Sequence, residues 1–169
     1  IVAAACLAHD LGNPPFGHSG EKTIATFFSE GKGQFLKEML EPEQWSDLTH
    51  FEGNANSFRW LVHQFRGRRR GGFAMTYSTL MSIVKYPYSS SKANAKGKFG
   101  YFTSEKEIFT LVADELGMLR VEDDRYCRHP LVYPVEAADD ICYQVMDIED
   151  AHKLKIVGTQ EVIDLFLGF

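Results

Sequence analysis

The chain has 169 residues, of which 44% are hydrophobic and 24% are charged, and its net charge is −5. This composition predicts one globular domain over residues 1–169 and excludes a disordered chain. No apolar run is long enough to span a bilayer, so we expect no membrane partner. Cys6, Cys127 and Cys142 form no C-x-x-C pair, which favours a reducing compartment and a cytoplasmic location.

Acidic residues are missing from a continuous stretch in the middle of the chain. From Gly53 to Ser104 the sequence holds no Asp or Glu but nine Lys and Arg, including the four arginines of the cluster Arg66–Arg70. Such a basic segment, residues 53–104, favours a polyanionic ligand that carries phosphates. The alternative is a solvated basic loop that happens to lack acids.

Hydrophobic spacing and capping residues predict a mainly α chain, and they indicate no convincing strand pair. A buried helix is expected over residues 1–11, because Gly12 and Pro14-Pro15 prevent its continuation. Ser19 is expected to cap a second helix that runs to about Phe28. Next come a short helix over 34–40, a turn at Pro42, a helix that opens at Asn54 or Asn56, and a loop over Arg66–Arg70.

The second half of the chain is predicted to hold the longest helix. A helix over residues 76–84 ends before Pro87, and residues 88–100 form a polar loop rich in Ser, Lys and Gly. Ser104 and Glu107 have the spacing of a capping box for a helix that stops at Gly117. Pro134 suits the first turn of a long helix that runs to about residue 150 or 153, and Thr159 is the expected cap of a last helix.

Four chemically useful side chains lie close together near the start of the chain. His9 and Asp10 are followed by a turn rich in Gly and Pro, and His18 and Glu21 come just beyond it. An imidazole beside a carboxylate suits a hard or borderline divalent metal. Neighbouring helical residues point about 100° apart, so the first pair can converge on one ion only near a helix end, which the turn supplies. This string predicts a metal-dependent hydrolase.

The string and three later segments resemble the HD-domain deoxynucleoside triphosphate triphosphohydrolases, in particular their bacterial dGTPase branch. The segments are H-D-L-G-N-P-P-F-G-H-S-G-E at 9–21, H-F-E-G-N at 50–54, a middle segment in two parts, M-S-I-V-K-Y-P-Y at 81–88 and K-F-G-Y-F-T-S-E-K at 98–106, and E-A-A-D-D-I-C-Y-Q-V-M-D-I-E-D at 136–150. The resemblance implies a helical HD-type fold, present in part. It also implies hydrolysis of a deoxynucleoside triphosphate, with dGTP favoured, to deoxynucleoside and inorganic triphosphate.

The resemblance also implies a metal site and a sugar site. His9, Asp10 and one carboxylate of the Asp139-Asp140 pair would bind a divalent cation, Mn²⁺ or Mg²⁺. We favour Asp139, because Asp139, Tyr143 and Asp147 share one helix face at i, i+4 and i+8. The family uses such a face for the metal and then, through an aromatic hydroxyl and a carboxylate, for the deoxyribose 3′-hydroxyl. The alternative for Asp139 is an acid on a helix surface.

His18 and Glu21 match the catalytic pair of the family. The resemblance implies that His18 approaches the α-phosphate, that Glu21 orients or polarises it, and that His50 adds a further donor. A His with a pKa near neutrality can donate to a phosphate oxygen or exchange a proton. The alternatives are that His18 caps the following helix and that His50 is a loop residue without a role.

Positive side chains are expected to hold the triphosphate. The resemblance implies this role for Lys85, Tyr86 and Lys106, while Arg59 or the Arg66–Arg70 cluster would offset further charge. The alternative for Lys106 is a solvated helix residue. For Arg66–Arg70 the alternatives are an exposed loop, an oligomer contact, an allosteric-nucleotide contact or an electrostatic contact with single-stranded nucleic acid.

The family pattern requires one more His ligand in a helix before His9, and only eight residues precede it. We therefore expect a fragment that lacks the N-terminal His ligand and the C-terminal part, and that binds metal more weakly than a complete site. The family tends to assemble, so a homo-oligomer is expected. The rival functions are another HD-type nucleotide phosphohydrolase or phosphodiesterase, and a non-catalytic module that binds nucleotides or nucleic acid.

Overall fold

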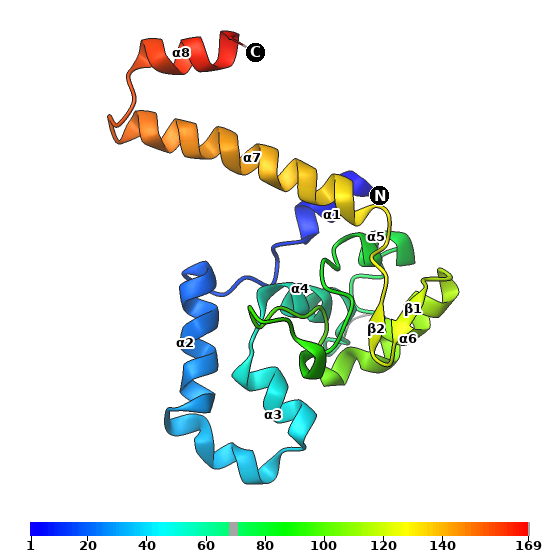
Figure 1. Ribbon diagram of the computed structural model, residues 1–169. Coiled ribbons are helices and arrows are strands. Elements are labelled where there is room, and N and C mark those ends of the chain that lie inside the picture. The colour runs from blue at the N-terminus through cyan, green and yellow to red at the C-terminus, as the bar shows by residue number, and fades with distance from the viewer. Residues whose placement is uncertain (68–70, 169) are drawn as a thin grey trace.

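Figure 1 shows the computed structural model, which describes residues 1–67 and 71–168. Helices dominate this part of the chain, as predicted. The α-helices are α1 (Val2–Ala8), α2 (Gly17–Ser29), α3 (Pro42–Thr49), α4 (Gly53–Val62), α5 (Tyr77–Ser82), α6 (Lys106–Glu115), α7 (Val132–Lys153) and α8 (Thr159–Leu167). The shorter elements are the 3-10 turns η1 (Lys32–Met39), η2 (Ser90–Lys92) and η3 (Thr103–Glu105) and the strands β1 (Arg120–Glu122) and β2 (Arg125–Tyr126).

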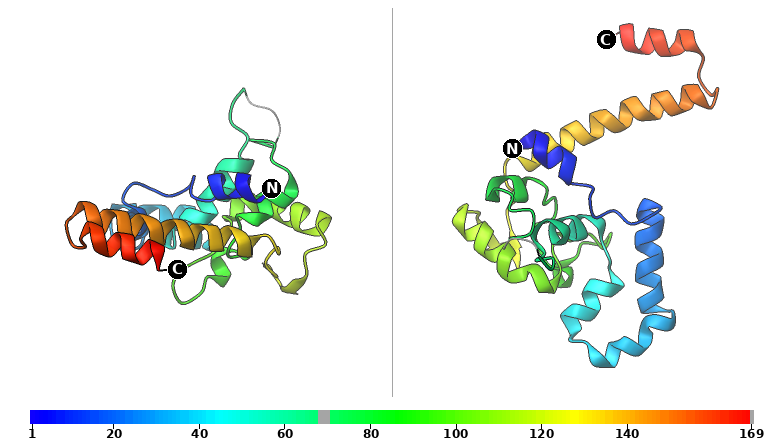
Figure 2. Two further views of the ribbon diagram at one scale, coloured as in Figure 1. Left: turned by 90° about the horizontal axis from the view of Figure 1, so that it is seen from above. Right: turned by 180° about the vertical axis from the view of Figure 1, so that it is seen from behind.

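The helices form a body from which α7 and α8 extend. In Figure 1, α1 lies beside the first turns of α7, while α2 and α3 lie at the far end of the body. α1 packs against both α7 and α5, and α2 packs against η1 and α3. Figure 2 shows from behind that most of α7, and α8 after it, lie away from the other helices. The body therefore meets the long helix only near the start of that helix.

Two clusters of buried apolar side chains hold the body together. The larger cluster joins α1, α4, α5, α6 and the first turn of α7. At its centre Phe109 stacks on Tyr101, with ring centroids 4.1 Å apart, and meets the edge of Phe58. The smaller cluster contains Ala55, Tyr88, Phe99 and Phe102. Removal of this apolar surface from water is the main stabilising contribution to such a fold.

The segment 88–100 differs from the polar loop that its composition predicts. Tyr88, Ser89, Ser90 and Phe99 are buried, and the segment contains the turn η2. Two aromatic residues, Tyr88 and Phe99, flank the polar run and anchor both of its ends in the smaller apolar cluster. The composition of the segment did not indicate that these two aromatic residues are buried.

One strand pair is present where none was predicted. β1 and β2 pair antiparallel across a turn at Asp123-Asp124, and Asp124 has a φ of +58°. Strands of three and two residues are too short to show an alternating pattern. Asp is one of the few residues that enter the left-handed region readily, which explains the tight turn.

Two helices begin with other capping residues than the sequence predicts. Pro42 begins α3 instead of forming a turn, and Glu41 is the N-cap. Proline suits the first helical position, because the N–H that it lacks would have no partner there. Ser104 and Glu107 do not form the expected capping box, because Ser104 lies within η3 and Glu105 precedes α6.

Other boundaries shift by a few residues. Ser19 lies within α2 and Thr159 is the first residue of α8, so neither residue is a cap. Glu52, rather than an Asn, caps α4 and accepts hydrogen bonds from two backbone N–H groups. The end of α6 just before Gly117 and the extent of α7 match the predictions.

Candidate active site

His9 and Asp10 follow directly after α1, which ends at Ala8 rather than at residue 11. His9 Nδ1 lies 2.8 Å from the carbonyl oxygen of Cys6, which is an acceptor, so the ring proton is assigned to Nδ1. His9 Nε2 is buried and has no hydrogen-bond partner among the described residues. It lies 3.5 Å from Asp10 Oδ1. The early end of α1 is what lets the two side chains face the same point.

Asp139 approaches this pair from α7. Its Oδ1 lies 3.3 Å from His9 Nε2, and one ligand atom each from His9, Asp10 and Asp139 falls within 4.8 Å of the others. An unprotonated imidazole nitrogen beside two carboxylates has only acceptors around it, and one divalent cation would satisfy all three groups. Asp140 is not part of this group, as expected for the neighbouring residue on a helix.

Backbone contacts hold the turn after His9 against α4. The Gly12 N–H donates to Ser57 Oγ at 2.9 Å, and Asn56 Nδ2 donates to the Gly12 carbonyl at 2.8 Å. The Ser57 hydroxyl in turn donates to the His9 carbonyl at 2.6 Å. A Cβ at position 12 would lie 2.1 Å from Ser57 N, so only glycine permits this approach.

His18 and Glu21 pair across the first turn of α2. His18 Nδ1 lies 2.9 Å from Glu21 Oε2, and the side chains are 86% and 10% exposed, respectively. The Gly53 N–H donates to Glu21 Oε1 at 2.7 Å, and Lys98 Nζ donates to Oε2 at 3.1 Å. Burial alone would raise the pKa of Glu21, but the bonds from His18, Gly53 and Lys98 outweigh it and lower that pKa. Glu21 is therefore held as a carboxylate.

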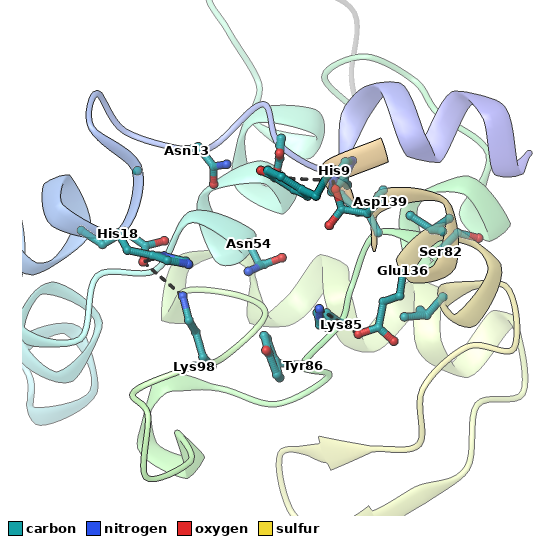
Figure 3. Close-up of a pocket in the computed structure, with 17 residues that line it drawn as sticks. His9, Asn13, His18, Asn54, Ser82, Lys85, Tyr86, Lys98, Glu136 and Asp139 are labelled. Atoms are coloured by element: carbon teal, nitrogen blue, oxygen red, sulfur yellow. Dashed lines mark hydrogen bonds and ion pairs between the residues drawn. The ribbon is translucent and has the colours of Figure 1, made fainter. Parts of the chain in front are cut away.

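The His9–Asp10–Asp139 group and the His18–Glu21 pair line one cavity of about 340 Å³, shown in Figure 3. Figure 3 shows His9 and Asp139 on one side and His18 with Lys98 on the other. The volume lies in the range of small-molecule sites. Further lining residues are Asp10, Asn13, Glu21, Asn54, Lys85, Tyr86, Glu136 and Tyr143.

Lys85 and Tyr86, predicted to hold the triphosphate, lie on the wall of this cavity. Lys85 Nζ lies 2.9 Å from Glu136 Oε1, and Arg128 Nη1 lies 2.9 Å from the other oxygen of Glu136. Burial would lower the pKa of Lys85, but the hydrogen bond and charge of Glu136 outweigh it and raise that pKa. Lys85 is thus a fixed cation tied to the start of α7.

Two other predicted site residues, His50 and Asp147, do not line this cavity. His50 lines an adjoining cavity together with His18 and Glu21, and its Nδ1 lies 3.0 Å from the Ser46 carbonyl. Asp147 is exposed and does not line the cavity that Tyr143 lines, although both share a face of α7.

Two of the remaining predicted cations, Lys106 and Arg59, pair with acids outside the cavity. Lys106 Nζ lies 2.6 Å from Asp124 Oδ2 and does not line the cavity. Arg59 Nη1 lies 2.7 Å from Glu105 Oε1, also outside it. In the Arg66–Arg70 cluster, Arg66 is exposed and Arg68–Arg70 lie outside the described residues.

Glu136, Lys98 and Asn54 also line the cavity, although the sequence pattern predicted no role for them. Glu136 precedes Asp139 by one helical turn, and that spacing was a usable signal for a shared face. Lys98 and Asn54 lie within segments that carry the family resemblance. Nothing in the local pattern around Lys98 indicates that it meets Glu21, which is 77 residues away.

In the described ranges, no helix combines the length and the hydropathy that a membrane span requires.

Comparison with known proteins supports the resemblance. No family model matches the chain. A deoxyguanosinetriphosphate triphosphohydrolase-like protein of Pseudomonas aeruginosa is 48% identical over 177 residues, which cover 99% of this chain and 39% of that protein. A protein of the same name from Synechocystis is 41% identical over 89% of the chain and 37% of its own length. The deoxyguanosinetriphosphate triphosphohydrolase of Yersinia enterocolitica is 32% identical over 97% of the chain and 37% of its length.

The chain spans about two fifths of the length of these curated relatives. Within that span the similarity runs from end to end and includes all four motif segments. Along its length the chain is therefore similar to part of the bacterial deoxyguanosinetriphosphate triphosphohydrolase-like proteins, which confirms the resemblance of its motifs.

Proposed function

We propose that this chain supplies most of the active site of an HD-type deoxynucleoside triphosphate triphosphohydrolase, with dGTP as the favoured substrate. The products would be a deoxynucleoside and inorganic triphosphate. The observation that carries the proposal is that the His9–Asp10–Asp139 group and the His18–Glu21 pair face one cavity. The names of the relatives point to the same substrate class.

A divalent cation, Mn²⁺ or Mg²⁺, is proposed to bind His9, Asp10 and Asp139. The buried, unpartnered Nε2 of His9 beside two carboxylates supports this fit. When bound, such a cation supplies Lewis acidity at a phosphate oxygen and lowers the pKa of a bound water. The carboxylates and the imidazole of this chain hold that charge at one end of the cavity.

His18 is proposed to act on the α-phosphate. Glu21 contacts His18 Nδ1, which leaves Nε2 of the exposed ring to face the ligand. From there the imidazole can donate a hydrogen bond to a phosphate oxygen or exchange a proton. Because the pKa of Glu21 is lowered, its carboxylate keeps this orientation through the neutral range.

The walls of the cavity suit the two ends of the substrate. Lys85 and Tyr86 are proposed to hold the triphosphate, since Lys85 is a fixed cation. Tyr143 is proposed to read the 3′-hydroxyl with its phenol group. Lys106 has no part in this contact, because it does not line the cavity and pairs with Asp124 instead.

The full-length protein should be incubated with Mn²⁺ and each deoxynucleoside triphosphate in ¹⁸O-labelled water, and its products identified by ³¹P NMR. We expect inorganic triphosphate that carries the label, with dGTP turned over fastest. Release of pyrophosphate or monophosphate would contradict the proposed bond cleavage. Equal turnover of dGTP and 2′,3′-dideoxy-GTP, which lacks the 3′-hydroxyl, would contradict the sugar contact at Tyr143.

The variant Asp10→Ala separates the enzyme from a binding module. We expect triphosphate release to be lost, because a carboxylate of the metal site is gone. If the wild-type protein binds deoxynucleoside triphosphates but never turns them over, and Asp10→Ala binds them equally well, the binding-module alternative is correct.

A further inference from the structure

Lys98 lies between two buried carboxylates that come from different parts of the chain. Its Nζ lies 2.6 Å from Glu52 Oε1 and 3.1 Å from Glu21 Oε2. The side chain of Lys98 is 18% exposed, and that of Glu52 only 2%. A buried charge is costly unless an opposite charge and hydrogen bonds compensate it. The three groups therefore form one ion cluster, in which each member depends on the others.

Glu52 is itself held rigidly by the start of α4. Its Oε2 accepts hydrogen bonds from the N–H groups of Asn54, at 2.8 Å, and Ala55, at 3.3 Å. Its Oε1 accepts a further bond from Asn54 Nδ2 at 2.9 Å. A carboxylate at a helix N-cap is also favoured by the helix dipole. Glu52 thus offers Lys98 a partner with a fixed position.

Both oxygens of Glu21 are engaged from three directions. Oε1 accepts the Gly53 N–H, while Oε2 meets His18 from its own helix and Lys98 from the segment 88–100. A Cβ at position 53 would lie 2.8 Å from Glu21 Oε1 and 2.4 Å from Asn13 Oδ1, so the close backbone approach needs glycine. Of these donors, Lys98 is the one with a full, permanent charge.

We propose that Lys98, clamped by Glu52, is the positioning residue that fixes the Glu21 carboxylate against His18. This inference rests on the proposed function and adds two residues to it. Lys98 does not need to touch the substrate for this role. Its ammonium group sets the orientation of Glu21, and through Glu21 it sets the orientation of the His18 ring.

The charge of Lys98 also acts on the protonation of Glu21. Lys98 is one of the groups that lower the pKa of Glu21 against its burial, and both carboxylates raise the pKa of Lys98. No other ionisable side chain in the described ranges, apart from His18, makes an ion pair or hydrogen bond with Glu21. The remaining ionisable groups that line the two cavities around Glu21 are His9, Asp10, Lys22, His50, Lys85, Tyr86, Lys96, Glu136, Asp139 and Tyr143.

The test compares pH profiles of kcat for triphosphate release by the full-length protein. In Lys98→Met the pKa of Glu21 should rise, so the acid limb moves to higher pH, and kcat should fall about tenfold or more. Lys98→Arg keeps the charge, so the acid limb should stay near its wild-type position and most of kcat should be retained. Lys92→Ala is the matched control, because it removes one charge from the same segment, where Lys92 lies 3.8 Å from Glu122. An acid limb that stays in place in Lys98→Met would overturn the proposal.

A second variant separates a loss of stability from an effect on Glu21. Lys98→Met leaves two buried carboxylates without a cation, which lowers stability. Lys98→Met/Glu52→Gln removes one of these charges, so its Tm should return towards the wild-type value while the shifted acid limb remains. If the acid limb returns together with the Tm, Lys98 is a structural residue only and the proposal is wrong.

A measurement without catalysis separates this inference from the proposed function. The Glu21 carboxyl signal should be titrated by ¹³C NMR in wild-type protein and in Lys98→Met, both free of metal. We expect a higher pKa in the variant, and an unchanged pKa would refute the role of Lys98. If the wild-type protein releases no triphosphate from any nucleotide, the proposed function fails, while this titration still decides the role of Lys98.

Discussion

His9 shows how a local backbone contact decides what a side chain can bind. Its Nδ1 is directed to the carbonyl of Cys6, one helical turn earlier, and its Nε2 is directed to Asp10 and Asp139. A His at the C-terminal end of a helix can reach such a carbonyl and still project its other nitrogen outwards. The position of His9 in the chain thus fixes both its tautomer and its direction.

The His18 imidazole should be the main acid–base group of the reaction. In His18→Gln we expect kcat for triphosphate release to fall by roughly 10²–10⁴-fold, because proton exchange with the phosphate is lost. The value of KM should change far less. Steady-state kinetics check this, with His152→Gln as control, since His152 is exposed near the end of α7. Equal losses in the two variants would contradict the assignment.

Glu21 should make the fold sensitive to acid. Its pKa is lowered from the ordinary value of 4.5, so its carboxylate stabilises the fold above that value, and this stabilisation is lost as the pH falls through the lowered pKa. Glu21→Gln should therefore unfold at lower urea concentration than wild type at neutral pH, and the difference should shrink as the pH falls below 4.5. Glu30→Gln, an exposed change beyond the same helix, should show no such pH dependence. A difference that is constant with pH would contradict the lowered pKa.

Among the elements, the contact of α1 with α7 determines the site. Ala5 and Ala8 of α1 are buried, and their small side chains let α7 come close. Val132 and Val135 are buried and anchor the first turn of α7 in the body, and Asp139 lies one helical turn after Val135. Beyond Tyr143, no residue of α7 lines the cavity, and the helix leaves the body.

The turn after α1 should tolerate no side chain at position 12. In Gly12→Ala the new Cβ would meet the backbone of α4, and we expect a loss of about 1–3 kcal/mol in the free energy of unfolding. Urea denaturation measures this loss. Gly158→Ala is the control, because a Cβ there meets only a flexible Glu161 oxygen at 3.5 Å. Equal stability of Gly12→Ala and wild type would show that the turn does not pack as described.

The sequence was informative for elements with a clear helical period and for the local motif. The long helix α7 and the grouping of His9 with Asp10 could be predicted, since both depend on neighbours in the chain. The pair β1–β2 could not, because it is too short to form a pattern. The contacts of Lys98 with Glu21 and Glu52 could not either, because they join residues 77 and 46 positions apart.

Over the whole molecule, charges that are separated in sequence are paired in space. The basic segment 53–104 contains no acid, yet Lys85 meets Glu136, Lys98 meets Glu21 and Arg59 meets Glu105. The field that this segment offers a polyanion is therefore weaker than its composition suggests. Phosphate binding would depend on the geometry of the cavity more than on the charge of the segment.

His9, Asp10 and Asp139 are proposed to hold one divalent cation. The most direct test is Mn²⁺ binding measured by electron paramagnetic resonance on wild type, Asp139→Asn and Asp140→Asn. We predict one bound Mn²⁺ for wild type. The affinity of Asp139→Asn for Mn²⁺ should be lower by about tenfold or more, and that of Asp140→Asn should change little. Absence of Mn²⁺ binding by the wild-type protein, or an equal loss of affinity in both variants, would contradict a metal site at His9, Asp10 and Asp139.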